Sequence, residues 1–525
     1  MSDLVIENKI PKIESAQKVK KENLKQRAYL NTITSLIDFV GAQVTGLIVS
    51  PFIVGGLGSS MYGIWQMLGQ LTGYSKIADS RATQVLKWTI AKKKNIASDD
   101  ELQTDLSSAF VVTLISMPIV LIIGSILSWY APIITKAEPQ YFTLIRVASS
   151  LLILSLVIAR VFDVYECILR GMNLSFKRMG FRTLIIVLGG VLKIAAILLG
   201  YGIIGLSVVQ ILITLITGLV IYSIVKKNVP WVKFGKTSYK EVVSFTKLSG
   251  WNMANTTAIT LLGQSDKIFL GIIAGPILVS SYSLTLFLPL AIGGIIFNII
   301  IGAIPGIGTL IGLKEYGKIY KAWRSINDLV FLLAVGAGVT IILFNYSFLS
   351  MWVGSEHFAG NLANALVMLL VIQELFVKQD GYVITATLEL KKKVLITFIS
   401  IIISFILGLV LIKNFGIVGL CVSLLTGRTF LFLAQRSIIE KEIKIDKVQS
   451  LLSFTQPFVV SILMLFSAFY FSYLISQASF LFLALLVPVT FFTALIIFFF
   501  LGLKAERRLE LIRLYSSIKL FKAKD

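Results

Sequence analysis

The sequence predicts an all-α polytopic membrane protein with about fourteen transmembrane helices. Hydrophobic residues make up 56% of its 525 positions and charged residues only 14%, and the mean hydropathy is +0.87. A soluble domain carries about a quarter charged residues, so the excess apolar surface has to meet lipid. The apolar runs last about 20–25 residues, the length of a helix that crosses roughly 30 Å of hydrocarbon.

These apolar runs recur along nearly the whole chain. The predicted spans lie near 28–55, 60–90, 105–131, 141–170, 179–200, 203–226, 243–273, 277–311, 323–350, 361–390, 392–412, 416–436, 450–474 and 479–503. Strands of a membrane barrel would be about ten residues long with alternating polarity, which these runs do not show.

The connections between the predicted spans alternate sharply in charge. One set is basic and holds Lys92–Lys94, Arg170–Arg182, Lys226–Lys247, Lys314–Arg324, Lys391–Lys393 and Arg436–Lys447, and the hydrophilic tails belong to the same set. The opposite set carries only Lys136 and Lys413. The positive-inside rule therefore places both termini in the cytoplasm of a bacterial inner membrane. The net charge of +22 is explained by this topology signal, and no basic-aromatic module points to nucleic acid.

The sequence shows no pattern that would carry enzyme chemistry. It has no Ser/His/Asp set, no phosphate-binding glycine loop and no His/Cys metal spacing. The predicted outer loops are all short, whereas a membrane glycosyltransferase or polymerase needs an ordered outer loop to hold its catalytic residues. We therefore predict a protein that is not an enzyme and has neither a metal nor another cofactor.

Two pairs of similar segments indicate an internal repeat. The segment Gly55–Tyr62 after the first span resembles Gly275–Tyr282 after the seventh, and the GIxGL turn at Gly202–Leu206 resembles Gly416–Leu420. Six crossings return the chain to the side of the membrane on which it began, so the two halves have the same orientation in the membrane. Such parallel repeats place a substrate site between the two lobes.

The repeat divides the chain into lobes of six helices each. The predicted parts are a cytoplasmic tail (1–26), an N-lobe (27–228), a cytoplasmic linker (229–240), a C-lobe (241–442), two further helices (450–503) and an amphipathic cytoplasmic tail (504–525). The eighth span contains Pro289 and several glycines, which predict a bent helix.

The chain resembles the polysaccharide-transporter branch of the MOP superfamily, the O-antigen or lipid-linked oligosaccharide flippases. The resemblance rests on the 6+6+2 arrangement and on the stretch Leu57–Trp65 followed by Tyr74–Asp79, with Arg81 where that family has a glycine. It implies two lobes that form a V around a cavity and open alternately to either side. It also implies a cargo of polyprenyl-pyrophosphate-linked oligosaccharide, and membrane lipids and polysaccharide polymerase or assembly proteins as partners.

Basic residues inside the spans are the candidates for binding such a cargo, because a charge at mid-bilayer is costly unless it faces water or a partner. Arg428, Arg160 and Lys378 lie nearest the middle of their spans, and Arg81 and Lys267 are secondary candidates. Two alternatives remain open, since Arg160 could pair with Asp163 and Lys378 with Glu374. Arg428 has no acid nearby in its own helix and is the strongest candidate.

Acidic residues inside the spans are candidates for coupling transport to Na+ or H+. Asp38 in the first span and Asp266 in the seventh are predicted for this role, and the alternative for Asp38 is an ion pair at the cytoplasmic mouth. Two rival transport functions remain, a flippase for the peptidoglycan precursor lipid II and a MATE-like multidrug exporter. An exporter of cationic drugs would favour acids and aromatic residues in its cavity, whereas the Arg and Lys here favour an anionic cargo.

Overall fold

The computed structural model describes residues 10–75, 82–94, 96–301, 304–387, 389–475 and 479–511, and the side chains of 10–29, 247–253, 255 and 304–306 are not described. The described residues form helices and no strands. The first half holds α1 (Ile10–Ser75), α2 (Ala82–Lys93), α3 (Asp99–Ile134), α4 (Phe142–Gly171), α5 (Phe181–Leu198) and α6 (Gly202–Asn228), with short 3-10 turns η2 (Pro139–Tyr141) and η3 (Ser175–Arg178). The predicted all-α fold class is confirmed.

The second half begins with several short helices. It holds α7 (Tyr239–Gln264), α8 (Asp266–Ala274), α9 (Pro276–Thr285), α10 (Phe287–Ile301), α11 (Ile304–Gly312), α12 (Tyr316–Trp352), η4 (Ser355–His357), α13 (Asn361–Ala386) and α14 (Leu390–Ile443). Two further helices follow, α15 (Lys447–Ser472) and α16 (Phe480–Leu501).

Ten of the described helices are long and apolar enough to cross a membrane, or twelve if each of two bent pairs counts as one span. The chain is therefore a multi-pass membrane protein. Two of the ten, α1 and α14, are interrupted by a glycine with non-helical backbone angles, Gly58 in α1 and Gly416 in α14. Each of these helices runs through two of the predicted ranges, and the number of fourteen spans stays a prediction.

The glycine breaks occur at matching places in the two halves. Gly202 and Gly416 have φ of 52° and 54°, and Gly58 and Gly275 have φ/ψ of 72°/166° and 91°/167°. Glycine adopts such positive φ values without the steric cost that a Cβ would bring. The residue that corresponds to Gly275 in backbone conformation is therefore Gly58, whereas the likeness of the two sequence segments had paired Gly55 with Gly275.

The bend predicted for the eighth span is confirmed. Helices α9 and α10 meet at an angle of 46°. Pro289 has no N–H group to donate to the carbonyl of Thr285, four residues earlier. The side-chain amide of Asn345 in α12 donates to this carbonyl oxygen instead, at 3.0 Å. The bend is thus held by a hydrogen bond from a neighbouring helix.

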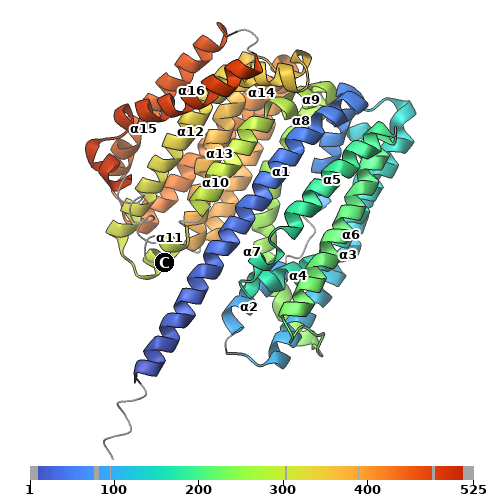
Figure 1. Ribbon diagram of the computed structural model, residues 1–525, viewed down its shortest axis with the longest axis vertical. Helices are drawn as coiled ribbons and strands as arrows, with labels where there is room; N and C mark the ends of the chain where they lie inside the picture. The colour runs from blue at the N-terminus through green and yellow to red at the C-terminus, as the bar shows by residue number, and fades with distance from the viewer. Residues whose placement is uncertain are drawn as a thin grey trace, which may run out of the picture.

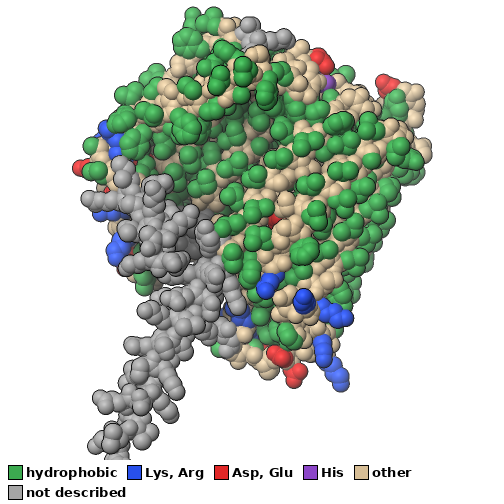
Figure 2. Space-filling view, in the orientation of Figure 1, with side chains coloured by type: hydrophobic (Ala, Val, Ile, Leu, Met, Phe, Trp, Pro, Cys, Tyr) green, Lys and Arg blue, Asp and Glu red, His purple; other side chains and the backbone are tan. Residues whose placement is uncertain are grey.

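The helices form two bundles, with α1 running between them (Figure 1). One bundle packs a core from α2, α3, α4, α6 and the start of α7, and the other packs a core from α10–α16. Figure 2 shows an apolar surface over much of the molecule, and the Lys and Arg side chains visible in this view lie along its lower and left margins. We call the end that carries the basic connections the basic end.

The two bundles meet closely at the end opposite the basic end. The indole Nε1 of Trp352 donates to the carbonyl of Leu47 at 2.7 Å, and Nζ of Lys136 donates to the carbonyl of Ile273 at 3.0 Å. A Cβ built on Gly63 of α1 would lie 1.8 Å from the carbonyl oxygen of Pro276 in α9, so only a glycine fits at this crossing. These contacts hold the two bundles together at this end.

The segment after α16 packs onto the second bundle. Nε of Arg507 donates to Oδ2 of the buried Asp328 in α12 at 2.8 Å, and Arg507 Nη1 donates to the carbonyl of Ser453 at 2.7 Å. Arg324 pairs with Glu510 at 2.8 Å. The predicted amphipathic tail therefore begins with two ion pairs to α12, and its residues 512–525 lie outside the described part.

Candidate functional site

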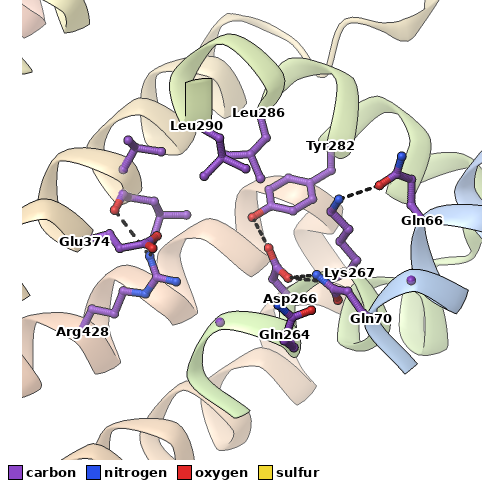
Figure 3. Close-up of a pocket in the computed structure, with 14 residues that line it drawn as sticks. Gln66, Gln70, Gln264, Asp266, Lys267, Tyr282, Leu286, Leu290, Glu374 and Arg428 are labelled. Atoms are coloured by element: carbon purple, nitrogen blue, oxygen red, sulfur yellow. Dashed lines mark hydrogen bonds and ion pairs between the residues drawn. The ribbon is translucent and has the colours of Figure 1, made fainter. Parts of the chain in front are cut away.

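A cavity of about 340 Å³ lies where the second segment of α1 meets α7–α10, α13 and α14. It is lined by Gln66, Gly69, Gln70, Gly263, Gln264, Asp266, Lys267, Tyr282, Leu286, Leu290, Leu370, Val371, Glu374 and Arg428. The lining therefore comes from both predicted lobes. Gln66 and Gln70 of α1 lie beside Asp266 and Lys267 on one side, and Arg428 and Glu374 lie on the other (Figure 3).

The polar wall on one side of the cavity is built around a break in the seventh span. The helical segments Thr256–Gln264 and Asp266–Ala274 meet at 44°. A break leaves the first N–H groups of the following helix without intrahelical acceptors. The side chain of Gln70 supplies one, because its Oε1 accepts from the backbone N–H groups of Lys267 at 3.1 Å and Ile268 at 3.3 Å. A side chain of α1 thus caps the start of α8.

Most other polar groups of this wall are hydrogen-bonded to α1, across the boundary of the predicted lobes. Asp266 accepts from Gln70 Nε2 at 2.6 Å and from the Tyr282 hydroxyl at 2.9 Å. The ammonium group of Lys267 donates to Gln66 Oε1 at 2.8 Å. Gln66, Gln70 and Tyr74 recur every four residues on one face of α1, and the Tyr74 hydroxyl donates to Ser265 Oγ at 2.8 Å.

The opposite wall carries Arg428 and Glu374 (Figure 3). Arg428 Nη1 lies 3.3 Å from Glu374 Oε2 and 3.4 Å from the carbonyl oxygen of Leu370. Lys378, one turn along α13, pairs with Glu374 Oε1 at 2.6 Å and lies 5.3 Å from the ring centre of Phe297. Two cations therefore share one carboxylate at the edge of the cavity.

The structure brings some of the predicted site residues together and places others elsewhere. Arg428, Lys267 and Asp266 line the cavity, and Lys378 is joined to it through Glu374. Arg81 lies outside the described residues.

Two predicted site residues lie in the predicted N-lobe and do not line this cavity. Arg160 is buried in α4 and pairs with Asp163 at 3.1 Å, the alternative that the spacing had left open. Asp38 accepts from Thr183 Oγ1 at 3.2 Å and lies 3.6 Å from Arg178 and 3.9 Å from Arg182. For Asp38, too, the sequence had left open an ion pair as the alternative to a role in coupling, and the structure has Asp38 near two arginines.

The sequence did not reveal the partner of Arg428. No acid lies near Arg428 in its own helix, yet Glu374 of α13 reaches it from 54 positions earlier. No pattern within one sequence signals such a contact, because it depends on how α13 and α14 pack. Glu374 was considered only as the i,i+4 partner of Lys378, which is also present.

The ionised groups that line the cavity balance one another. Asp266 and Glu374 are acidic, Lys267 and Arg428 are basic, and their formal charges cancel. An ion inside a membrane protein is stable only when it is paired or solvated. The cavity therefore holds Arg428 in an ion pair and Lys267 in a hydrogen bond.

The comparisons with known proteins agree with this arrangement. Residues 87–302 match a family described as polysaccharide biosynthesis protein. No curated protein sequence matches the chain.

Solved transporter structures share the fold at low sequence identity. The inward closed conformation of the lipid II flippase MurJ superposes with a TM-score of 0.63, at 13% identity, over 89% of this chain and 98% of that one. An inward-facing MATE family multidrug resistance transporter of the MOP superfamily superposes with a TM-score of 0.58, at 16% identity, over 79% of this chain and 96% of that one. A Vibrio cholerae MATE transporter gives 0.56, at 15% identity, over 81% and 98%.

The structure is that of a multi-pass membrane protein with the fold of these transporters. The family match over residues 87–302 and this shared fold agree with the resemblance found in the sequence.

Proposed function

We propose that the chain is a flippase that moves polyprenyl-pyrophosphate-linked oligosaccharide, an O-antigen or polysaccharide repeat unit, across the bacterial inner membrane by alternating access. The observation that carries the proposal is the placement of Arg428 and Lys267 in one cavity between the lobes. Guanidinium and ammonium groups bind phosphate oxygens by charge-assisted hydrogen bonds, and Arg offers a planar donor fork. The polar side chains of Gln66, Gln70 and Gln264 offer hydrogen bonds to sugar hydroxyls.

The topology belongs to the same proposal. With the basic end in the cytoplasm, both termini are cytoplasmic, and the contacts between Trp352 and Leu47 close the outer side. The cavity would then load from the cytoplasmic leaflet, where such lipids are assembled, and would release its cargo outside to polymerase or assembly proteins. Asp266 is the better placed of the two candidates for coupling to Na+ or H+, because it lines the cavity.

A lipid II flippase is the second candidate. The MurJ structure covers 89% of this chain, whereas the MATE structure quoted above covers 79%. Both lipid cargoes carry a pyrophosphate, so the same cations would serve either one. A multidrug exporter is less favoured, because a cavity for cationic drugs would favour acids and aromatic residues, and Tyr282 is the one aromatic residue among the described lining residues. A glycosyltransferase or polymerase is disfavoured by the short outer connections.

The test is reconstitution in liposomes with a fluorescent lipid-linked oligosaccharide whose outer-leaflet fraction is read by quenching. We expect the wild type to transport it above protein-free background. We expect Arg428→Ala to lower the rate roughly 10–100-fold, the effect of losing a hydrogen bond to a charged group. Arg146→Ala is the matched control, because Arg146 stacks on Trp129, 4.0 Å from its ring centre, outside the cavity.

Parallel assays with fluorescent lipid II and with a cationic dye separate the candidates. Wild-type transport of the oligosaccharide lipid at background would refute the proposal. Preferred transport of lipid II or of the dye would replace it with the corresponding candidate. Equal rates for Arg428→Ala and the control would remove Arg428 from the cargo path.

A further inference from the structure

Glu374 occupies the position between the two cations of the C-lobe wall. Its Oε1 lies 2.6 Å from Lys378 Nζ, and its Oε2 lies 3.3 Å from Arg428 Nη1. Arg428 is nearly buried, with its side chain 9% exposed, whereas Lys378 is 49% exposed. Glu374 thus connects an exposed cation at the edge of the site with a buried cation inside it.

Glu374 does not satisfy all the hydrogen-bond donors of the Arg428 guanidinium. The Nε atom of Arg428 is buried and has no hydrogen-bond partner among the described residues. The 3.3 Å contact to Glu374 is single and long for an Arg–carboxylate pair, which is frequently bidentate at 2.7–2.9 Å. The guanidinium is therefore held by the carboxylate but is not saturated by it.

We propose that Glu374 is an internal counter-anion that the diphosphate of the cargo displaces from Arg428 and Lys378, and that it sets how readily the cargo is released. This inference rests on the proposed flippase function. A diphosphate carries more charge and more acceptor oxygens than one carboxylate, so it can replace Glu374 at both cations. When the cargo leaves, Glu374 returns, and the cations are not left unpaired inside the membrane.

Such a competitor is useful because a transporter must bind its cargo firmly enough to load it and weakly enough to let it go. Without the carboxylate, no other anion would compete with the diphosphate for Arg428 and Lys378. The cargo would then bind more tightly and leave more slowly. Glu374 therefore acts on the cargo through these two cations and does not bind it directly.

A purely structural role for Glu374 predicts a different result. If the carboxylate only holds α13 to α14, its loss misplaces Arg428, and anion binding weakens or stays unchanged. Neutralising Glu374 therefore distinguishes the two roles by the sign of the change in affinity.

The experiment measures binding of farnesyl diphosphate and of inorganic pyrophosphate to the purified full-length protein by calorimetry. We expect Glu374→Gln to bind farnesyl diphosphate at least about tenfold more tightly than the wild type, since an opposing charge is removed beside the ligand. Glu389→Gln is the matched control, because Glu389 makes an i,i+3 pair with Lys392 at 3.1 Å and does not line the cavity. Glu374→Ala, which also removes the charge, is the second variant should Glu374→Gln purify poorly, and the same direction is expected.

Transport in liposomes supplies the second readout. We expect Glu374→Gln to lower both KM and kcat, whereas Glu374→Asp, which keeps the charge, restores values near the wild type. Unchanged or weaker binding by Glu374→Gln and Glu374→Ala would overturn the inference. Wild-type protein that binds farnesyl diphosphate no better than farnesol would instead contradict the proposed function itself, so the two failures are distinguishable.

Discussion

Gln70 of α1 is hydrogen-bonded to Asp266 at the first residue of α8, with 2.6 Å between Gln70 Nε2 and Asp266 Oδ1. The same side chain accepts hydrogen bonds from two backbone N–H groups of α8. A residue of the predicted N-lobe thereby completes the end of a broken helix of the C-lobe. Any rocking of one lobe against the other has to stretch or break these bonds.

Replacing Gln70 should therefore loosen the contact between the lobes. Gln70→Met keeps the length of the side chain but leaves the α8 N–H groups without this acceptor, at a cost of about 1–3 kcal/mol. We expect a broader distribution of distances between spin labels at positions 138 and 413, which lie on the predicted outer side of the two lobes. Gln373→Met is the control, because Gln373 donates to Leu425 and Thr429 within the C-lobe. Matching distributions in both variants would show that Gln70 does not hold the lobes.

Gly63 should be intolerant of any side chain. A Cβ at this position would meet the backbone of Pro276, which cannot rotate away as a flexible side chain can. We expect Gly63→Ala to force α1 and α9 apart and to lengthen the same label distance. Gly55→Ala provides the comparison, because a Cβ at Gly55 meets no atom within 4 Å. A Gly63→Ala protein with the wild-type distance would contradict the close crossing.

Arg507 should contribute to stability. Removing one partner of a buried ion pair leaves an uncompensated charge and costs about 3–5 kcal/mol. We expect Arg507→Gln to lower the melting temperature of the purified protein, and the double variant Arg507→Gln/Asp328→Asn to recover part of the loss. Arg508→Gln is the control, since Arg508 donates to the carbonyl of Leu503 at the half-exposed surface. Equal melting temperatures for both single variants would rule out a structural role for the Asp328 pair.

Arg160 should matter for folding rather than for cargo. Its ion pair with Asp163 lies within α4, and it does not line the cavity. We expect Arg160→Gln to lower the melting temperature while the KM for lipid-linked oligosaccharide stays within about twofold of the wild type. A clear rise in KM without loss of stability would return Arg160 to the cargo path.

The composition and periodicity of the sequence determined the class of structure. Long apolar runs can satisfy their backbone hydrogen bonds in lipid only as helices, so the all-α multi-pass fold followed from the sequence itself. The glycine turns indicated the repeat, and Gly202 and Gly416 both have a positive φ, of 52° and 54°. Mid-span charges pointed to Arg428, Arg160 and Lys378, with Arg81 and Lys267 as secondary candidates, because a charge in a membrane needs water or a partner. Of these, Arg428 and Lys267 line the cavity.

The tertiary structure decided which partner each charge has. Asp163 and Glu374 lie at helical spacing from Arg160 and Lys378, so these pairs could be anticipated. The contacts of Glu374 with Arg428 and of Gln70 with Asp266 join residues 54 and 196 positions apart. Such contacts arise from the packing of helices that carry no mutual signal in one sequence. The apolar pattern determines that a helix crosses the membrane. The neighbouring helices, and the rotation of the helix about its own axis, determine which groups its polar side chains contact.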